Sequence, residues 1–171
     1  MSKVLVSYQT LYGATREAAS VIADTLEKDY GFQVDLYQLE ENKITPDSSD
    51  YDNIIIGSCI FHGKWGKSAK EFLRNDFTNK NVAVFVCAGF AGEEKLHNQA
   101  HRVFLEEVLE KYPQIKPVSM KAFGGRVPRA KIPHIWYMQT TKKMPSFGYD
   151  TRNLEKVKKW AHELGNLFHK T

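Results

Sequence analysis

The sequence of 171 residues lacks the features that define several large classes of protein. It holds two cysteines, Cys59 and Cys87, which is too few for a disulfide framework and gives no CxxC pair. Its longest apolar runs have the length of a strand, so we expect no segment to span a bilayer. The opening MSKVLVSY reads as the start of a strand, and we expect no signal peptide. These absences favour a cytoplasmic globular protein with reduced thiols.

Basic charge is concentrated in one late segment, although the net charge is only +4. Residues 1–120 carry 13 basic and 17 acidic side chains, whereas residues 121–152 carry seven basic side chains and one acidic one. A local basic patch suits an anionic ligand, a lipid surface or a nucleic acid. No nucleic-acid motif accompanies the patch, so we expect no nucleic-acid partner.

Apolar strands alternate with amphipathic helices along the chain. The patterns predict strands at 4–8, 34–39, 53–58, 81–89 and 116–123, and helices at 15–29, 67–76, 93–112 and 153–168. This alternation predicts an α/β fold with a doubly wound, five-stranded parallel sheet in the order 2-1-3-4-5. Ligands of such sheets bind at the carboxyl ends of the strands, where the loops after the first, third and fourth strands meet.

The link between the last strand and the last helix is unusually long. Residues 124–152 exceed the usual length of such connections. They contain IPHIWYM and PSFGY, which is too much aromatic and aliphatic content for a disordered tail. We therefore predict a basic, aromatic, ordered insertion within a single domain that covers residues 1–171.

The first loop, TLYGAT at residues 10–15, has the chemistry of an anion site. The N-terminus of the following helix offers free N–H groups, Thr10 and Thr15 add hydroxyls, and Gly13 permits close backbone approach. The loop has no lysine, which excludes a P-loop, and no GxGxxG. It suits one terminal phosphate monoester. The alternative is an ordinary helix start with Thr15 as the N-cap.

Two further loops, at residues 57–68 and 87–94, combine glycines with aromatic side chains. Phe61, Trp65 and Phe90 offer flat surfaces beside tight backbone turns. Each loop alone is consistent with core caps and chain turns. Because all three loops share one edge of the predicted sheet, together they favour a site for a planar heterocycle that carries a phosphate.

Other functions of this fold class lack the residues that they need. A response-regulator receiver requires acidic residues after the first strand and an aspartate after the third, where this chain has Gln9 and Ser58. A cysteine phosphatase requires a cysteine in the first loop. His97 and His101 have helical spacing but no accompanying metalloprotease glutamate, so we expect solvated histidines and no metal site.

Four short segments carry a family resemblance that extends over nearly the whole chain. They are G-x-T-R at Gly13, Thr15 and Arg16; G-S-x-I-x-x-G from Gly57 to Gly63; G-G-R-x-P at 124–128; and D-T-R at 150–152, with Trp160 in the helix that follows. Together they resemble the flavodoxin-like, menaquinone-dependent protoporphyrinogen oxidases. TLYGAT also resembles the flavodoxin phosphate loop, with Tyr12 and Ala14 in place of the commoner threonine and asparagine.

The resemblance implies non-covalent binding of FMN by three groups of residues. They are Thr10, Leu11, Tyr12, Gly13, Ala14 and Thr15; Ser58, Cys59, Ile60, Phe61, His62, Gly63 and Trp65; and Ala88, Gly89, Phe90, Ala91 and Gly92. The flavin ring would carry the redox chemistry, so we expect no catalytic side chain. His62 is the sole acid–base candidate.

The resemblance also implies a reaction: dehydrogenation of protoporphyrinogen IX in haem biosynthesis, with a quinone as the electron acceptor. Arg126, Arg129 and Lys131 would pair with the propionates of the porphyrinogen. The same charges, with Trp136, would suit peripheral contact with an anionic membrane at its inner face. Two alternatives stay open: a flavodoxin-type carrier with a protein redox partner, and a flavin-free binding domain if Tyr12 fills the phosphate pocket.

Overall fold

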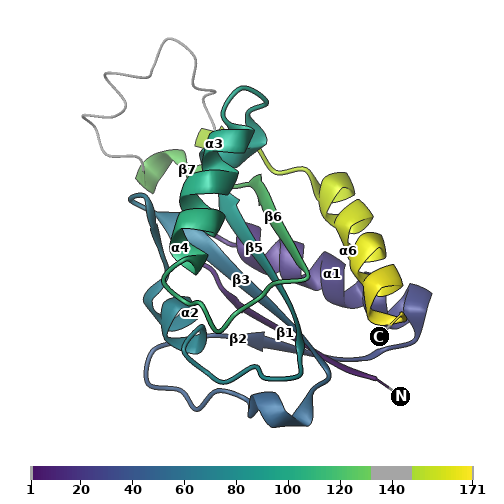
Figure 1. Ribbon diagram of the computed structural model, residues 1–171. Coiled ribbons are helices and arrows are strands. Elements are labelled where there is room, and N and C mark those ends of the chain that lie inside the picture. Colours follow the sequence, from purple (N-terminus) through teal and green to yellow (C-terminus); the bar gives the residue numbers. More distant parts are fainter. Residues whose placement is uncertain (1, 132–147, 171) are drawn as a thin grey trace.

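A computed structural model describes residues 2–131 and 148–170 (Figure 1). Its main sheet has the order β2-β1-β3-β5-β6, and every neighbouring pair on this path is parallel. The strands are β1 (Lys3–Gln9), β2 (Gln33–Gln38), β3 (Asn53–Phe61), β5 (Asn81–Ala88) and β6 (Ser119–Gly124). The two-residue β4 (Lys64–Trp65) pairs antiparallel with β3. The predicted order 2-1-3-4-5 is therefore confirmed, since β4 only adds a hairpin to β3.

Apolar runs in the central strands explain why the sheet is covered on both faces. Ile54, Ile55 and Ile56 of β3 are all fully buried, as are Val4, Leu5 and Val6 of β1. Consecutive residues of a strand point to opposite faces, so an unbroken apolar run requires helices on both sides.

Helices cover the two faces in separate groups (Figure 1). The helices α1 (Ala14–Tyr30) and α6 (Leu154–Phe168) share one core with the sheet. The short helices α2 (Lys67–Phe72), α3 (His97–His101) and α4 (Glu107–Leu109) lie over the other core. In the first core, Trp160 packs edge-to-face on Phe85 and Phe123, with ring centroids 5.9 and 5.6 Å apart.

Two predicted segments differ in detail from the structure. The helix predicted at 93–112 starts at His97, and a π-helical segment, Arg102–Glu106, separates α3 from α4. The loop expected after residue 58 is largely a hairpin, because β3 continues to Phe61 and turns at His62 and Gly63. Both turn residues have positive φ, 48° and 73°, as a two-residue turn of type I′ requires.

The long link after β6 has ordered ends in the described part of the chain. Its first strand, β7 (Arg126–Pro128), pairs antiparallel with β8 (Gly148–Asp150), and a 3-10 turn covers Arg129–Lys131. The pairing of Arg126 with Asp150 brings the two ends of the segment together. Trp136 lies outside the described residues. No described helix has the length and apolarity that crossing a membrane would require.

Candidate functional site

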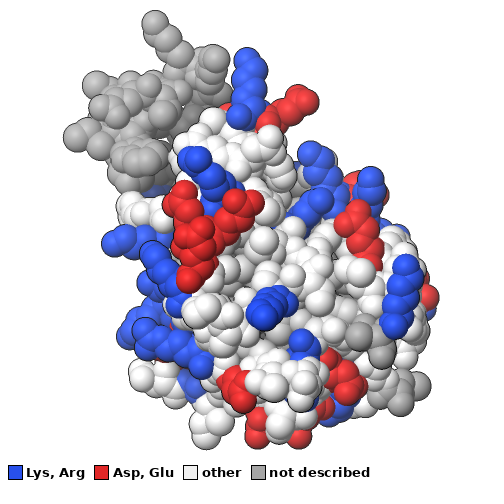
Figure 2. All heavy atoms as spheres, viewed as in Figure 1, with Lys and Arg blue, Asp and Glu red and all other residues white. Residues whose placement is uncertain are grey.

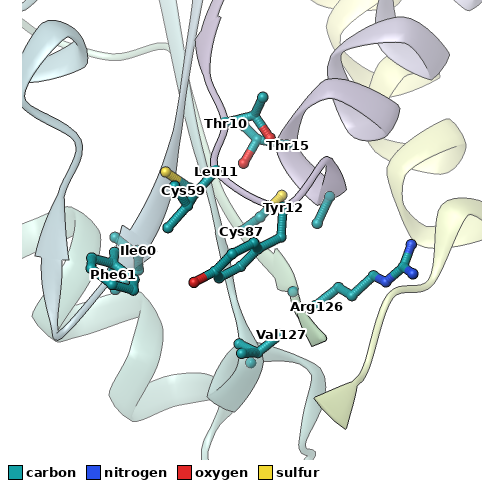
Figure 3. A pocket seen from close by; sticks show the side chains of 13 residues that line it. Thr10, Leu11, Tyr12, Thr15, Cys59, Ile60, Phe61, Cys87, Arg126 and Val127 are labelled. Atoms are coloured by element: carbon teal, nitrogen blue, oxygen red, sulfur yellow. The ribbon is translucent and has the colours of Figure 1, made fainter. Parts of the chain in front are cut away.

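A pocket lies at the carboxyl ends of β1, β3 and β5, the edge at which the sequence predicts a ligand (Figure 3). Its walls come from four chain segments. They are Thr10, Leu11, Tyr12, Ala14 and Thr15; Cys59, Ile60 and Phe61; Cys87 and Gly89; and Gly125, Arg126 and Val127. Most of these residues are predicted from the sequence, and the structure brings them together.

The loop before α1 leaves polar groups free for an anion. Gly13 is the N-cap of α1, with φ of 91° and no side-chain cap, so the alternative of an ordinary helix start with Thr15 as the N-cap does not hold. Thr10 instead accepts a hydrogen bond at Oγ1 from the N–H of Gly13, at 3.1 Å. The Thr15 hydroxyl is fully buried and has no hydrogen-bond partner, although the Cys87 thiol lies beside it. A buried hydroxyl without a partner is costly, so a ligand that pairs with it gains affinity.

Tyr12 does not cover the two threonines. Its ring extends away from Thr10 and Thr15 toward Phe61 (Figure 3). The rings of Tyr12 and Phe61 meet edge-to-face, with centroids 6.4 Å apart. Phe61 is 46% exposed, and the two rings flank one side of the pocket. This arrangement leaves the helix N-terminus open to a phosphate.

The wall between β3 and β5 is uncharged. Cys59 and Cys87 are register partners on these neighbouring strands. Burial raises the pKa of the Cys87 thiol to about 12 and also raises the pKa of Cys59, so both are neutral thiols at physiological pH. Cys87 is not among the predicted site residues. The shared register of the two strands is the signal that places it beside Cys59.

Several predicted site residues lie away from the pocket wall. His62 and Gly63 form the exposed hairpin turn, and Phe90 is 49% exposed in the turn Gly89–Gly92. Ala88, Ala91, Gly92 and Gly13 also do not line the pocket.

Ser58 and Trp65 are buried for structural reasons. Ser58 Oγ accepts from the N–H of Gly66 at 3.0 Å and donates to the carbonyl of Cys59. The expectation for Trp65 as a flat surface at the site needs correction. Its indole N–H donates to the Phe104 carbonyl at 2.6 Å, and only 4% of the residue is exposed, because β4 turns the ring into the core.

The fourth side of the pocket comes from the start of β7. Arg126, predicted as a substrate residue, is exposed and lines the pocket beside Gly125 and Val127. The sequence reasoning missed Gly125 and Val127, although both flank the predicted Arg126. Lys131 is exposed and does not line the pocket. The backbone of Arg129 lies in the 3-10 turn after β7.

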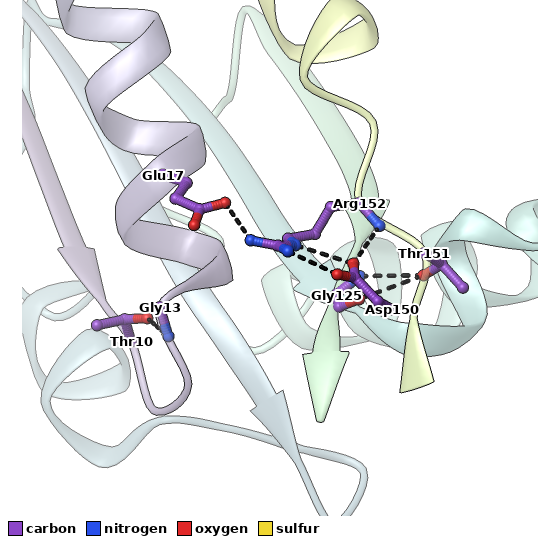
Figure 4. Close-up of polar contacts among 7 residues, drawn as sticks. All are labelled: Thr10, Gly13, Glu17, Gly125, Asp150, Thr151 and Arg152. Carbon is purple, nitrogen blue, oxygen red and sulfur yellow. Dashed lines mark hydrogen bonds and ion pairs between the residues drawn. The ribbon is translucent and has the colours of Figure 1, made fainter. Parts of the chain in front are cut away.

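The D-T-R segment joins this fourth side to the rest of the site (Figure 4). Thr151 Oγ1 donates to the Gly89 carbonyl at 2.8 Å and accepts from the Gly125 N–H at 3.2 Å. Its side chain thus fixes two residues of the pocket wall relative to each other. Side-chain atoms on Gly92 or Gly124 would overlap Thr151, so both positions require glycine.

Arg152 connects the same segment to α1 (Figure 4). Its guanidinium binds Asp150 through two nitrogens and Glu17, in the first turn of α1, through a third. These hydrogen bonds hold the pKa of Asp150 below its ordinary value. Glu17 would otherwise add an unbalanced negative charge near a helix N-terminus that is suited to a phosphate.

Arg152→Gln is expected to weaken FMN binding about fivefold, equivalent to about 1 kcal/mol, because Glu17 then repels the phosphate. The double variant Arg152→Gln/Glu17→Gln should recover most of this loss in a fluorescence titration with FMN. Lys28→Gln breaks an exposed ion pair with Asp24 on the same helix and serves as the control. Equal FMN affinity of Arg152→Gln and Lys28→Gln would contradict the charge argument.

No cluster of metal-ligating side chains occurs in residues 2–131 and 148–170. The two histidines considered in the sequence have separate contacts. His97 Nδ1 lies 2.8 Å from the Ala91 carbonyl, and His101 Nδ1 lies 3.1 Å from Glu106.

Comparison with known proteins agrees with the fold. The family model for the flavodoxin domain matches residues 5–147, and the chain belongs to this family. It is 34% identical to the protoporphyrinogen IX dehydrogenase [quinone] of Escherichia coli (strain K12), over 96% of each chain. These findings confirm the resemblance seen in the motifs.

Solved flavodoxins share the fold. Oxidised flavodoxin 2 from Bacillus cereus superposes with a TM-score of 0.57 at 21% identity, over 96% of this chain and 99% of that one. A short-chain flavodoxin associated with a bacterial microcompartment gives a TM-score of 0.59 at 15% identity, over 98% and 99% of the two chains.

FMN is the cofactor that membership of this family implies, and the pocket fits it. The buried, unpartnered Thr15 hydroxyl and the uncapped N-terminus of α1 offer donors to a phosphate without a lysine. The neutral wall of Cys59 and Cys87 and the ring pair of Tyr12 and Phe61 suit a flat, largely apolar ring. The alternative of a flavin-free binding domain therefore does not hold.

Proposed function

We propose that this protein is an FMN-dependent oxidoreductase that dehydrogenates protoporphyrinogen IX and passes the electrons to a quinone. Bound FMN would supply the electron-accepting chemistry. The residues that line the pocket would hold it: the loop 10–15 at the phosphate, and Cys59, Phe61, Gly89 and Gly125 around the ring. The protein would act as one domain, with residues 124–152 as an insertion that supplies the substrate side.

The observation that carries this proposal is the position of Arg126. An exposed arginine in the wall of a flavin pocket can pair with a substrate carboxylate, and protoporphyrinogen IX carries two propionates. The similarity to the Escherichia coli dehydrogenase over 96% of both chains supports the same substrate class. A basic segment beside the pocket also suits a protein that works at the anionic inner face of a membrane, where quinones reside.

Arg126→Ala is expected to raise KM for protoporphyrinogen IX about tenfold, because a charge-assisted hydrogen bond to a carboxylate is lost, while kcat changes less. The assay follows protoporphyrin fluorescence with FMN-loaded protein and a menaquinone analogue under anaerobic conditions. Arg74→Ala removes an exposed arginine after α2 that does not line the pocket and serves as the control. The substrate assignment fails if FMN-loaded wild-type protein gives no turnover.

A flavodoxin-type electron carrier is the second candidate. Three apolar side chains at the carboxyl edge of the sheet, Leu11, Phe61 and Phe90, are each between 46% and 49% exposed. Exposed apolar side chains around a redox site suit docking of a protein partner. Reduction of the bound FMN by a flavodoxin reductase, without turnover of porphyrinogen, would favour this function.

A further inference from the structure

A second hollow opens at the free edge of β6, between α3 and α6, and shares no lining residue with the cofactor pocket. Its volume is about 470 Å³. Pockets for small organic ligands range from about 300 to 1,000 Å³. Among the strands of the described chain, β6 pairs only with β5, so its other edge presents unpaired backbone groups here. We call this hollow the edge groove.

The floor of the edge groove is apolar and buried. It contains Ala122 and Phe123 of β6 and Trp160 of α6, which are between 1% and 4% exposed. The indole N–H of Trp160 donates to Ser119 Oγ at 2.8 Å, which fixes the ring and satisfies its polar atom. Such a floor makes no hydrogen-bonding demand on a ligand that fills the hollow.

The rim of the edge groove carries lysines without ion-pair partners. Lys121 extends from β6, and Lys156 and Lys159 lie one turn apart on α6. Within residues 2–131 and 148–170, none of the three forms a salt bridge. Glu94 and Glu163 also line the groove, so three positive charges face two negative ones. Figure 2 shows basic and acidic side chains interspersed with uncharged surface on this face of the molecule.

We propose that the edge groove binds an amphipathic organic anion. Its carboxylate, sulfonate or phosphate group would pair with Lys121, Lys156 and Lys159, while its apolar body would fill the hollow between α3 and α6. Among the described residues, the three lysines have no ion-pair partner that an incoming anion would have to displace. The ring of Trp160 is already held by its hydrogen bond to Ser119. Such an anion can come from solution or from an anionic lipid, since both present the same charged head on an apolar body.

The test uses FMN-saturated protein, so that the cofactor pocket is filled. The probe is 1-anilinonaphthalene-8-sulfonate, whose fluorescence rises in apolar surroundings, and the uncharged N-phenyl-1-naphthylamine is its matched control. We expect the charged dye to bind at least about tenfold more tightly, which is the value of one charge-assisted hydrogen bond. Equal affinity for the two dyes overturns the proposal.

Variants on α6 locate the binding. Lys159→Gln should weaken binding of the charged dye about tenfold, whereas Lys158→Gln, a neighbouring exposed lysine outside the groove, should not change it. Glu163→Gln should tighten binding about threefold, because it removes a like charge. These side chains are exposed, so the variants should fold, and thermal melting checks this. Equal binding by Lys159→Gln and Lys158→Gln overturns the proposal.

Vesicles then separate the two sources of the anion. Loss of binding to phosphatidylglycerol vesicles in Lys121→Gln/Lys159→Gln, but not in Lys158→Gln, identifies a lipid. Unchanged vesicle binding together with weaker binding of the dye identifies a soluble anion.

Discussion

Thr15→Val is expected to lower the affinity for FMN by about 10- to 100-fold, the value of a hydrogen bond to a charged phosphate. Valine has nearly the shape of threonine and lacks only the hydroxyl, so the change at this fully buried position is mainly the loss of that polar group. Because the hydroxyl has no partner in the protein, its removal should stabilise the cofactor-free protein by about 1 kcal/mol. The variant should therefore be more stable without FMN and bind FMN more weakly.

Thr25→Val is the matched control, since Thr25 is a buried threonine on the same helix. Its hydroxyl donates to the Val21 carbonyl at 2.7 Å and does not line the pocket. This variant should leave FMN affinity unchanged in a fluorescence titration. Urea unfolding of both variants without cofactor tests the stability difference. Wild-type affinity in Thr15→Val would show that this hydroxyl does not contact the phosphate.

Gly57→Ala should destabilise the protein by about 3 kcal/mol, at the upper end of the usual cost of overpacking. A Cβ at Gly57 would overlap three atoms of the Phe85 ring. Phe85 has no free space to move into, because it is fully buried and packs on Phe123 and Trp160, with ring centroids 6.1 and 5.9 Å away. For a chain of this length the loss corresponds to about 6 to 12 °C in Tm.

A double-mutant cycle identifies the cause of that loss. Phe85→Leu removes the ring atoms that the new Cβ would meet, at the cost of a cavity of its own. If the overlap is responsible, the double variant Gly57→Ala/Phe85→Leu will lose less stability than the sum of the two single variants. Additive losses in thermal unfolding would contradict this explanation. If the losses are instead less than additive, Gly57 of the G-S-x-I-x-x-G segment acts through packing, whereas Cys59 and Ile60 of that segment line the pocket.

Continuous apolar runs were sufficient to predict the parallel sheet. The three consecutive isoleucines of β3 and the VAVFV run of β5 predict strands that are covered on both faces. The order of the strands and the position of the site at their carboxyl ends follow from the alternation of strands and helices.

Details that depend on local geometry could not be predicted from composition. Aromatic content alone does not distinguish Trp65, which β4 turns into the core, from Phe61, which stays at the pocket. The N-cap of α1 is Gly13, whose backbone is left-handed. The sequence does not reveal this conformation, and threonine at position 15 is a residue type that is common at N-caps. Gly125 and Val127 reach the pocket through contacts far along the chain: Thr151, 26 positions after Gly125, binds Gly125, and β8 pairs with β7.

Because Thr151 and Arg152 anchor the pocket wall, the site can be completed only late in the synthesis of the chain. The helix and strand at the phosphate loop emerge from the ribosome first, but Gly89 and Gly125 are fixed only after residue 151 has been synthesised. The core beneath them needs Trp160 and Leu164 of α6 as well. A nascent chain that ends before α6 therefore has the sequence of a flavin site without its geometry. We therefore expect the cofactor to be captured late, after the C-terminal helix has completed the fold.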